Sequence, residues 1–151
     1  MHRLHSAALL CCFLSPSLSA QKGRDLSKLD ACKVLTRADV AAATKGKVMT
    51  SVGGGVGGVH CMYVVDAASG SGSYQLFLQQ PAAAEALWKI ESAAERGTLV
   101  PGLWSEAYVK PRSADQFALI ALRRGDMAIE IHGPSKNVVL ALAKVAISRL
   151  E

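Results

Sequence analysis

The chain has 151 residues, of which 50% are hydrophobic and 19% are charged, with 17 Lys and Arg side chains against 12 Asp and Glu. The basic excess is small and scattered, and its longest run is Arg123-Arg124, so the composition does not favour nucleic-acid binding. This length suits a single hydrophobic core of ordinary size.

Residues 1–20 have the pattern of a removable secretory signal peptide. A basic start precedes an apolar run over 7–14 and a small-residue stretch over 15–20. The run is too short to cross a bilayer, which takes about 20 apolar residues, and no later segment comes close. Cys11 and Cys12 lie inside the run, so we expect no lipid attachment there. We therefore predict an exported protein, periplasmic or secreted, with no integral membrane span after signal removal.

Two cysteines, Cys32 and Cys61, remain after the signal peptide is removed. An even number of cysteines in an exported chain favours a disulfide, because oxidising compartments preserve it. The bridge would close a loop of about 29 residues and stabilise the fold by roughly 3 to 4 kcal/mol. The alternatives are two free thiols or a metal pair. A cysteine pair without Cys-x-x-Cys spacing, however, suits neither zinc binding nor redox chemistry well.

Residues 21–31 are polar and charged, which predicts a flexible lead-in to a single domain over 32–151. The first helix is predicted to begin after Thr36, because the Thr36 hydroxyl can cap the amide of Asp39. We expect this helix to end near Gly46.

A glycine-rich segment and a hairpin follow. Gly53–Gly58 has five glycines in six residues and is predicted to be a loop. Alternating apolar and polar side chains predict strands over His60–Val65 and Tyr74–Gln79, joined by a Ser- and Gly-rich turn. Lys47–Val52 is a candidate for one further strand.

The second half continues with a helix, three strands and a last helix. Pro81 suits the start of the helix, which ends at Gly97. The three strands are expected around Glu106–Val109, Phe117–Leu122 and Met127–Ile131. Arg124-Gly-Asp126 spells an adhesion tripeptide, but Gly-Asp between apolar strands predicts a hairpin turn. Pro134 and Ser135 begin the last helix. This order predicts an α+β fold in which an antiparallel sheet of about five strands packs against two or three helices.

The sequence predicts neither a cofactor nor a metal. Gly53–Gly58 contains a Gly-x-Gly-x-x-Gly pattern, but a strand follows it where dinucleotide binding requires a helix. His60 and His132 could hold a metal with Asp66 or Glu130 if their strands were neighbours. Two scattered histidines are more often ordinary surface residues.

We expect a non-enzymatic domain that binds another protein, an envelope component or a small ligand. Recognition usually occurs on loops, and the candidate loops are Gly53–Gly58 and the segment Pro101, Gly102, Leu103 and Trp104. The alternative is a small metal-dependent or hydrolase-like enzyme using His60, Glu106 and His132. That alternative requires the three side chains to converge in one pocket.

Three segments, Asp30–Ala43, Gly58–Tyr63 and Val100–Tyr108, resemble small exported bacterial proteins of unknown function, many of which are lipoproteins. The resemblance implies that the cysteine before the first helix pairs with the one in the first strand. It also implies that the Pro-Gly-Leu-x-x-Glu-Ala segment leads into a later pair of strands, and it supplies no activity. The chain departs from the group at Trp104, where glycine is common, and in lacking a lipid-attachment cysteine.

Overall fold

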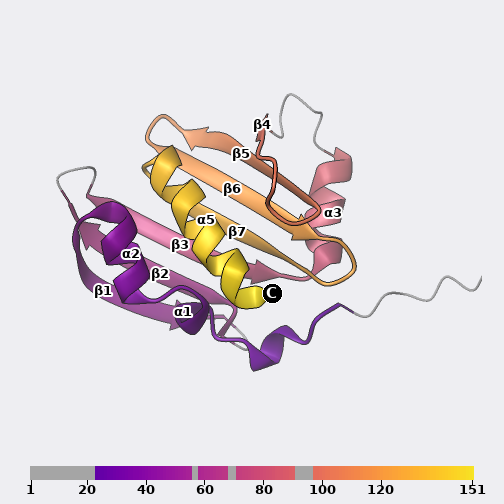
Figure 1. The fold of residues 1–151 in the computed structure, drawn as a ribbon, viewed down its shortest axis with the longest axis horizontal. Coiled ribbons are helices and arrows are strands. Elements are labelled where there is room, and N and C mark those ends of the chain that lie inside the picture. Colours follow the sequence, from indigo (N-terminus) through magenta and orange to yellow (C-terminus); the bar gives the residue numbers. More distant parts are fainter. Residues whose placement is uncertain (1–22, 56–57, 68–70, 91–96) are drawn as a thin grey trace, which may run out of the picture.

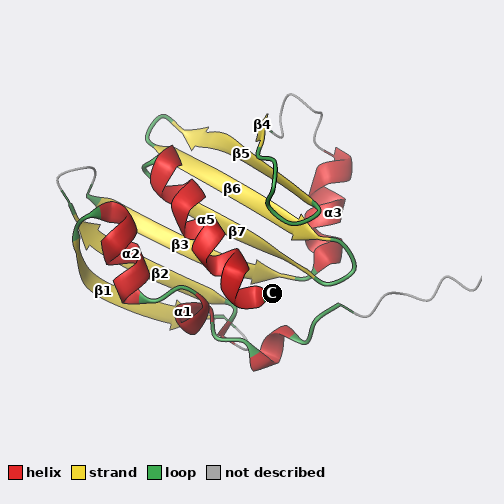
Figure 2. Ribbon diagram, in the orientation of Figure 1, coloured by secondary structure: helices red, strands yellow, loops and turns green. Residues whose placement is uncertain are grey.

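The computed structural model describes residues 23–55, 58–67, 71–90 and 97–151. Within them the chain is α+β, with a single antiparallel sheet and helices on both of its faces (Figures 1 and 2). The strands are β1 (Lys47–Gly54), β2 (His60–Asp66), β3 (Gly72–Gln79), β4 (Thr98–Leu99), β5 (Glu106–Ser113), β6 (Gln116–Arg123) and β7 (Met127–Gly133). The helices are the 3-10 turn η1 (Leu26–Lys28) and the α-helices α1 (Ala31–Val34), α2 (Arg37–Thr44), α3 (Pro81–Ile90) and α5 (Lys136–Leu150).

The α+β class and the antiparallel sheet are confirmed, but the predicted number of strands is not. In the described part of the chain, the sheet has seven strands in the order β1-β2-β3-β7-β6-β5-β4, against about five expected, and there are four α-helices. The candidate strand over Lys47–Val52 is real and extends to Gly54 as β1. β4 has two residues and α1 four, which is too short for either to show a periodic pattern.

The predicted capped helix is confirmed as α2. Thr36 accepts a hydrogen bond from the amide of Asp39, and the Asp39 carboxylate accepts one from the amide of Thr36. In the segment expected to be a flexible lead-in, residues 23–31 contain η1 and bury Leu26 in the core. The signal peptide predicted over 1–20 lies outside the described residues.

The main core lies between the sheet and the layer formed by α1, α2 and α5, which Figure 1 shows on the near face. α3 packs on the opposite face against β6 and β7, where Ile120, Leu122 and Ala128 form a second, smaller cluster. β6 is therefore buried on both faces, as its continuous apolar run predicts. We call the face that carries α3 the outer face.

The predicted disulfide between Cys32 and Cys61 is present. It joins α1 to β2 with a Cα–Cα distance of 5.2 Å, and Cys61 is fully buried. The Arg124-Gly-Asp126 segment forms the β6–β7 hairpin turn as predicted, with Gly125 at φ 74° and Asp126 paired with Arg24. None of the described helices combines the length and apolar character that crossing a membrane requires.

Candidate functional site

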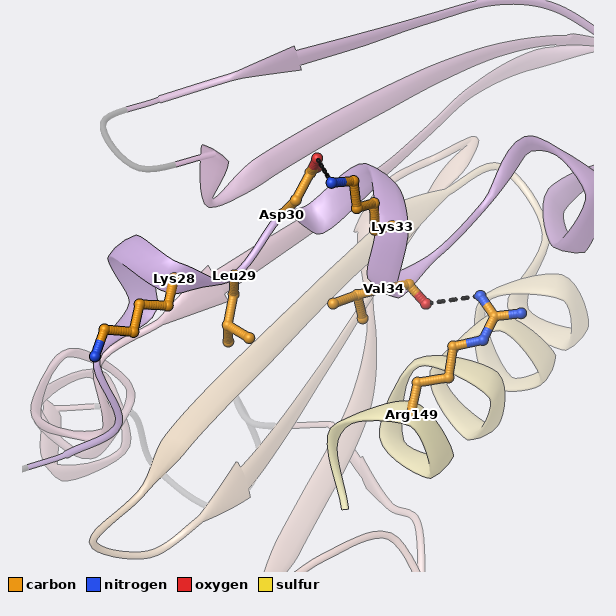
Figure 3. A pocket seen from close by; sticks show the side chains of 6 residues that line it. All are labelled: Lys28, Leu29, Asp30, Lys33, Val34 and Arg149. Atoms are coloured by element: carbon orange, nitrogen blue, oxygen red, sulfur yellow. Dashed lines mark hydrogen bonds and ion pairs between the residues drawn. The ribbon is translucent and has the colours of Figure 1, made fainter.

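A groove lies where η1 and α1 approach the last turn of α5 (Figure 3). We call it the α1–α5 groove, a cavity of about 380 Å³ lined by Lys28, Leu29, Asp30, Lys33, Val34 and Arg149. Its volume falls within the range of about 300 to 1,000 Å³ found for small-ligand sites. Leu29 and Val34 give it an apolar floor that is continuous with the core, and the other four residues form a polar rim.

Short helical turns form one wall of the groove, and side-chain caps hold them in place. Asp25 accepts a hydrogen bond from the amide of Ser27 in η1, and Asp30 accepts one of 2.9 Å from the amide of Cys32. A four-residue helix is not stable alone. The disulfide fixes α1 against β2, so the position of this wall depends on a covalent bond.

Arg149 forms the opposite wall and is held rigidly. Its guanidinium donates to the Val34 carbonyl at 3.0 Å and to both carboxylate oxygens of Asp39, at 2.5 and 2.7 Å. Burial alone would raise the pKa of Asp39, but the hydrogen bonds from Arg149 and Thr36 outweigh it and lower that pKa. The same contact with Asp39 raises the pKa of Arg149.

The two lysines of the rim are held loosely by comparison. Lys28 Nζ lies 3.6 Å from Asp25 and Lys33 Nζ lies 3.9 Å from Asp30, and both lysine side chains are more than 80% exposed. Exposed pairs of this kind contribute little stability. Both ammonium groups can therefore turn toward a ligand at small cost, whereas the Asp30 carboxylate is engaged in capping α1.

The groove lies within the more basic part of the molecule. Segments 23–47 and 135–151, which include α1, α2 and α5, contain nine basic and four acidic side chains. The remaining described residues contain five basic and six acidic ones. The excess positive charge of the described chain thus lies in these two segments, which lie far apart in the sequence.

The predicted binding loop is partly used for packing. Leu103 is 5% exposed and belongs to the core. Trp104 is half-buried, with the guanidinium of Arg123 5.0 Å from its ring centre. Only Pro101 and Gly102 are exposed at the tip. Within this candidate loop, Leu103 thus packs inward, and the accessible surface comes from Pro101, Gly102 and part of Trp104.

The predicted glycine loop is partly strand. Gly53 and Gly54 end β1, while residues 56–57 lie outside the described residues. A Cβ at Gly53 would lie only 3.3 Å from the Cys32 sulfur, so the missing side chain lets the disulfide approach the sheet. The glycine at position 53 thus serves close packing, whereas we expected backbone freedom.

The three residues of the enzyme alternative do not converge. His60 on β2 and His132 on β7 are separated by β3, and the ring of Phe77 stands between them, 4.3 Å from His60 and 5.3 Å from His132. The register places Glu106 two strands and four residues from His132, about 16 Å between Cα atoms at ordinary strand spacings. Glu106 instead accepts hydrogen bonds from Tyr108 and Arg124.

A shared metal site for His60 and His132 would require that their strands be neighbours. Their strands are not neighbours. Among the described residues, no three His, Cys, Asp or Glu side chains are grouped so that they could hold a metal ion.

A polar network on the outer face was only partly foreseen. His132 is buried, with Nε2 2.5 Å from Glu130 and Nδ1 2.5 Å from the guanidinium of Arg112. Gln79 donates a further hydrogen bond to Glu130 at 2.7 Å. Because a guanidinium only donates, Nδ1 must accept, and the proton of the neutral ring lies on Nε2.

The network also controls the charge of Glu130. Burial alone would raise the pKa of Glu130, but the interactions with His132, followed by the hydrogen bond from Gln79, outweigh it and hold that pKa below its usual value. The alternation of β7 places Glu130 and His132 on one face, so this pair could be found in the sequence. No sequence signal connects Arg112 or Gln79 to it.

No protein-family model matches this chain, and no curated protein or solved structure is significantly similar to it. The assignment of a function therefore depends on the geometry described above.

Proposed function

We propose that this chain is an exported, non-enzymatic binding domain whose α1–α5 groove takes an anionic amphiphile, such as an acyl phosphate or carboxylate of the cell envelope. One observation carries the proposal: a cavity of about 380 Å³ with an apolar floor has two loosely held lysines and the ion-paired Arg149 in its lining, while the only carboxylate of that lining caps a helix.

The chemistry of the groove selects this ligand class. Leu29 and Val34 can cover an alkyl chain, and each buried methylene contributes about 0.8 kcal/mol. The loosely held Lys28 and Lys33 favour an anionic head, because charge-assisted hydrogen bonds are roughly twice as strong as neutral ones, whereas the charge of Arg149 is already paired with Asp39. The basic helical layer around the groove would attract anionic ligands over a longer range.

Export is supported by the sequence and by the disulfide. The signal-like pattern of residues 1–20 predicts secretion. A disulfide that closes a long loop persists in oxidising compartments and is rare in the cytosol.

The left-handed backbone at Trp104 supports membership of the group of small exported bacterial proteins. Its φ is 48°, in the region that favours glycine. Glycine is common at this position in that group, so the conformation agrees with the resemblance even where the residue differs.

Decyl phosphate, titrated into isotope-labelled protein below its critical micelle concentration, tests the proposal. We expect saturable ¹H–¹⁵N shifts for Leu29, Val34 and the Nε–H of Arg149. Decyl maltoside tests whether the alkyl chain suffices, and inorganic phosphate whether the head suffices. Each alone should bind at least tenfold more weakly than decyl phosphate, because each lacks one of the two groups that the groove is proposed to bind. A tenfold difference corresponds to about 1.4 kcal/mol.

Matched charge-reversal variants separate the groove from the general basic character of the layer. Lys28→Glu/Lys33→Glu should weaken decyl phosphate binding at least tenfold. Lys136→Glu/Lys144→Glu makes the same change in net charge at exposed positions of α5 outside the groove lining and should change it little. Equal weakening by both variants, or no saturable shift in the unmodified protein, would contradict the proposal.

A further inference from the structure

The two edges of the sheet differ in how they are protected against pairing. At one edge, β4 consists only of Thr98 and Leu99. The rest of this edge is formed by β5, which carries Lys110, Pro111 and Arg112. A short strand, a proline and charged side chains are the usual devices against edge-to-edge association. This edge is therefore protected.

The opposite edge, β1, has such devices only near its start, where Arg37 donates to the Val48 carbonyl and the register shifts between Val48 and Thr50. It is eight residues long, and its charged side chain is Lys47 at the start. A register irregularity between Val48 and Thr50 is followed by five residues that pair regularly with β2. Val52 is apolar and yet 51% exposed. A further strand paired with β1 would cover it.

We propose that β1 pairs antiparallel with β1 of a second copy, about a two-fold axis at Ser51, to give a symmetric dimer with one continuous sheet. Two-fold dimers are by far the commonest oligomers, and in them one surface must complement itself. This surface does so in its side-chain pattern, and its one charged side chain, Lys47, does not meet its own copy.

The register favours a second copy as the partner, and the charge of β1 does not oppose it. Pairing about Ser51 sets Thr50 opposite Val52 of the second copy. It leaves the two Lys47 side chains at opposite ends, about 27 Å apart along the strands, so like charges do not meet.

The same register keeps the outer faces of both copies together. Val64 pairs with Thr50 and Met62 pairs with Val52 within one copy. Dimerisation therefore builds two cross-strand rows, each running from Val64 through Thr50 to Val52 and Met62 of the second copy. Such rows of β-branched and apolar side chains are the pairs that stabilise sheets.

The dimer should be weak. Pairing one strand with its copy buries less than the 1,200 to 2,000 Å² typical of stable interfaces, so we expect a dissociation constant above about 1 µM. Sedimentation equilibrium of protein purified from the exported fraction, from micromolar to near-millimolar concentration, should show a reversible monomer–dimer equilibrium.

Val52→Lys should abolish the dimer at every concentration, because it places a charge in the middle of the edge. Leu99→Lys is the matched control: Leu99 is 57% exposed on the protected edge, and its replacement should leave the equilibrium unchanged. Ser51→Cys tests the register, since two cysteines on the two-fold axis should cross-link on mild oxidation. A monomer at all concentrations, equal effects of the two lysine variants, or a dimer that Ser51→Cys does not cross-link would overturn the proposal.

Discussion

The disulfide should account for a large share of the stability of this fold. Cys32 and Cys61 are separated by 29 residues in sequence, and closing a loop of this length stabilises the folded state by about 3.5 kcal/mol in the chain-entropy model. Small domains have a total stability of roughly 5 to 15 kcal/mol. For a domain of this size, we expect loss of the bridge to lower the melting temperature by roughly 10 to 18 °C.

Urea unfolding followed by circular dichroism measures this effect directly. Oxidised protein, chemically reduced protein and the double variant Cys32→Ala/Cys61→Ala should be compared under the same conditions. The reduced protein keeps both sulfur atoms and so isolates loop closure. The double variant also loses packing at the fully buried Cys61 and should be the least stable of the three.

The comparison can fail in a clear way. Equal urea midpoints for the oxidised and reduced proteins would refute the loop-closure argument. A reduced protein that unfolds earlier but binds decyl phosphate normally while still folded would show that the disulfide is not needed to position α1 beside the groove.

Three further outcomes follow from individual contacts. Gly133→Ala should cost about 1 to 3 kcal/mol in a thermal melt, because a Cβ there would overlap the buried ring of Tyr74; an unchanged melting temperature would contradict that packing. Asp39→Asn should cost about 1 kcal/mol at neutral pH, since it removes the charge that pairs with Arg149. The pKa of Asp39 is lower in the folded protein than the value of about 3.9 in the unfolded chain. The stability that the Asp39 charge contributes is therefore complete above this unfolded pKa and is lost as the pH falls through the folded pKa. The free energies of unfolding of Asp39→Asn and the unmodified protein should thus converge in acid. ¹⁵N spectra of the neutral His132 ring should show a protonated Nε2 and an unprotonated Nδ1, and the opposite tautomer would exclude the hydrogen bond that the ring accepts from the neighbouring guanidinium.

Local signals in the sequence predicted most of the elements. The capping residues Thr36 and Asp39 located the start of α2, because a cap depends on residues three apart in the chain. Alternation located β2, β3 and β7, since a strand with one buried face repeats every two residues, whereas a continuous apolar run located β6. β4 and α1 were missed because two and four residues are too few to show a period.

Long-range contacts could not be predicted in this way. The pairing of β3 with β7 places Phe77 between His60 and His132, which separates the two histidines of the enzyme alternative. Alternation assigns a side chain to a face, but it does not say which strand lies beside it. The positive φ of Trp104 could not be predicted from the sequence either, because bulky residues rarely adopt left-handed backbone.

By itself, the sequence determined the α+β class, the capped helix, the hairpins and the two cysteines available for a bridge, because each depends on neighbours in the chain or on composition. Only the tertiary structure decided the strand order, the network around His132 and the α1–α5 groove. The groove needs Leu29 and Val34 from the start of the domain and Arg149 from its last helix turn. Packing of the whole core brings these residues together, since their separation in the chain exceeds any local pattern.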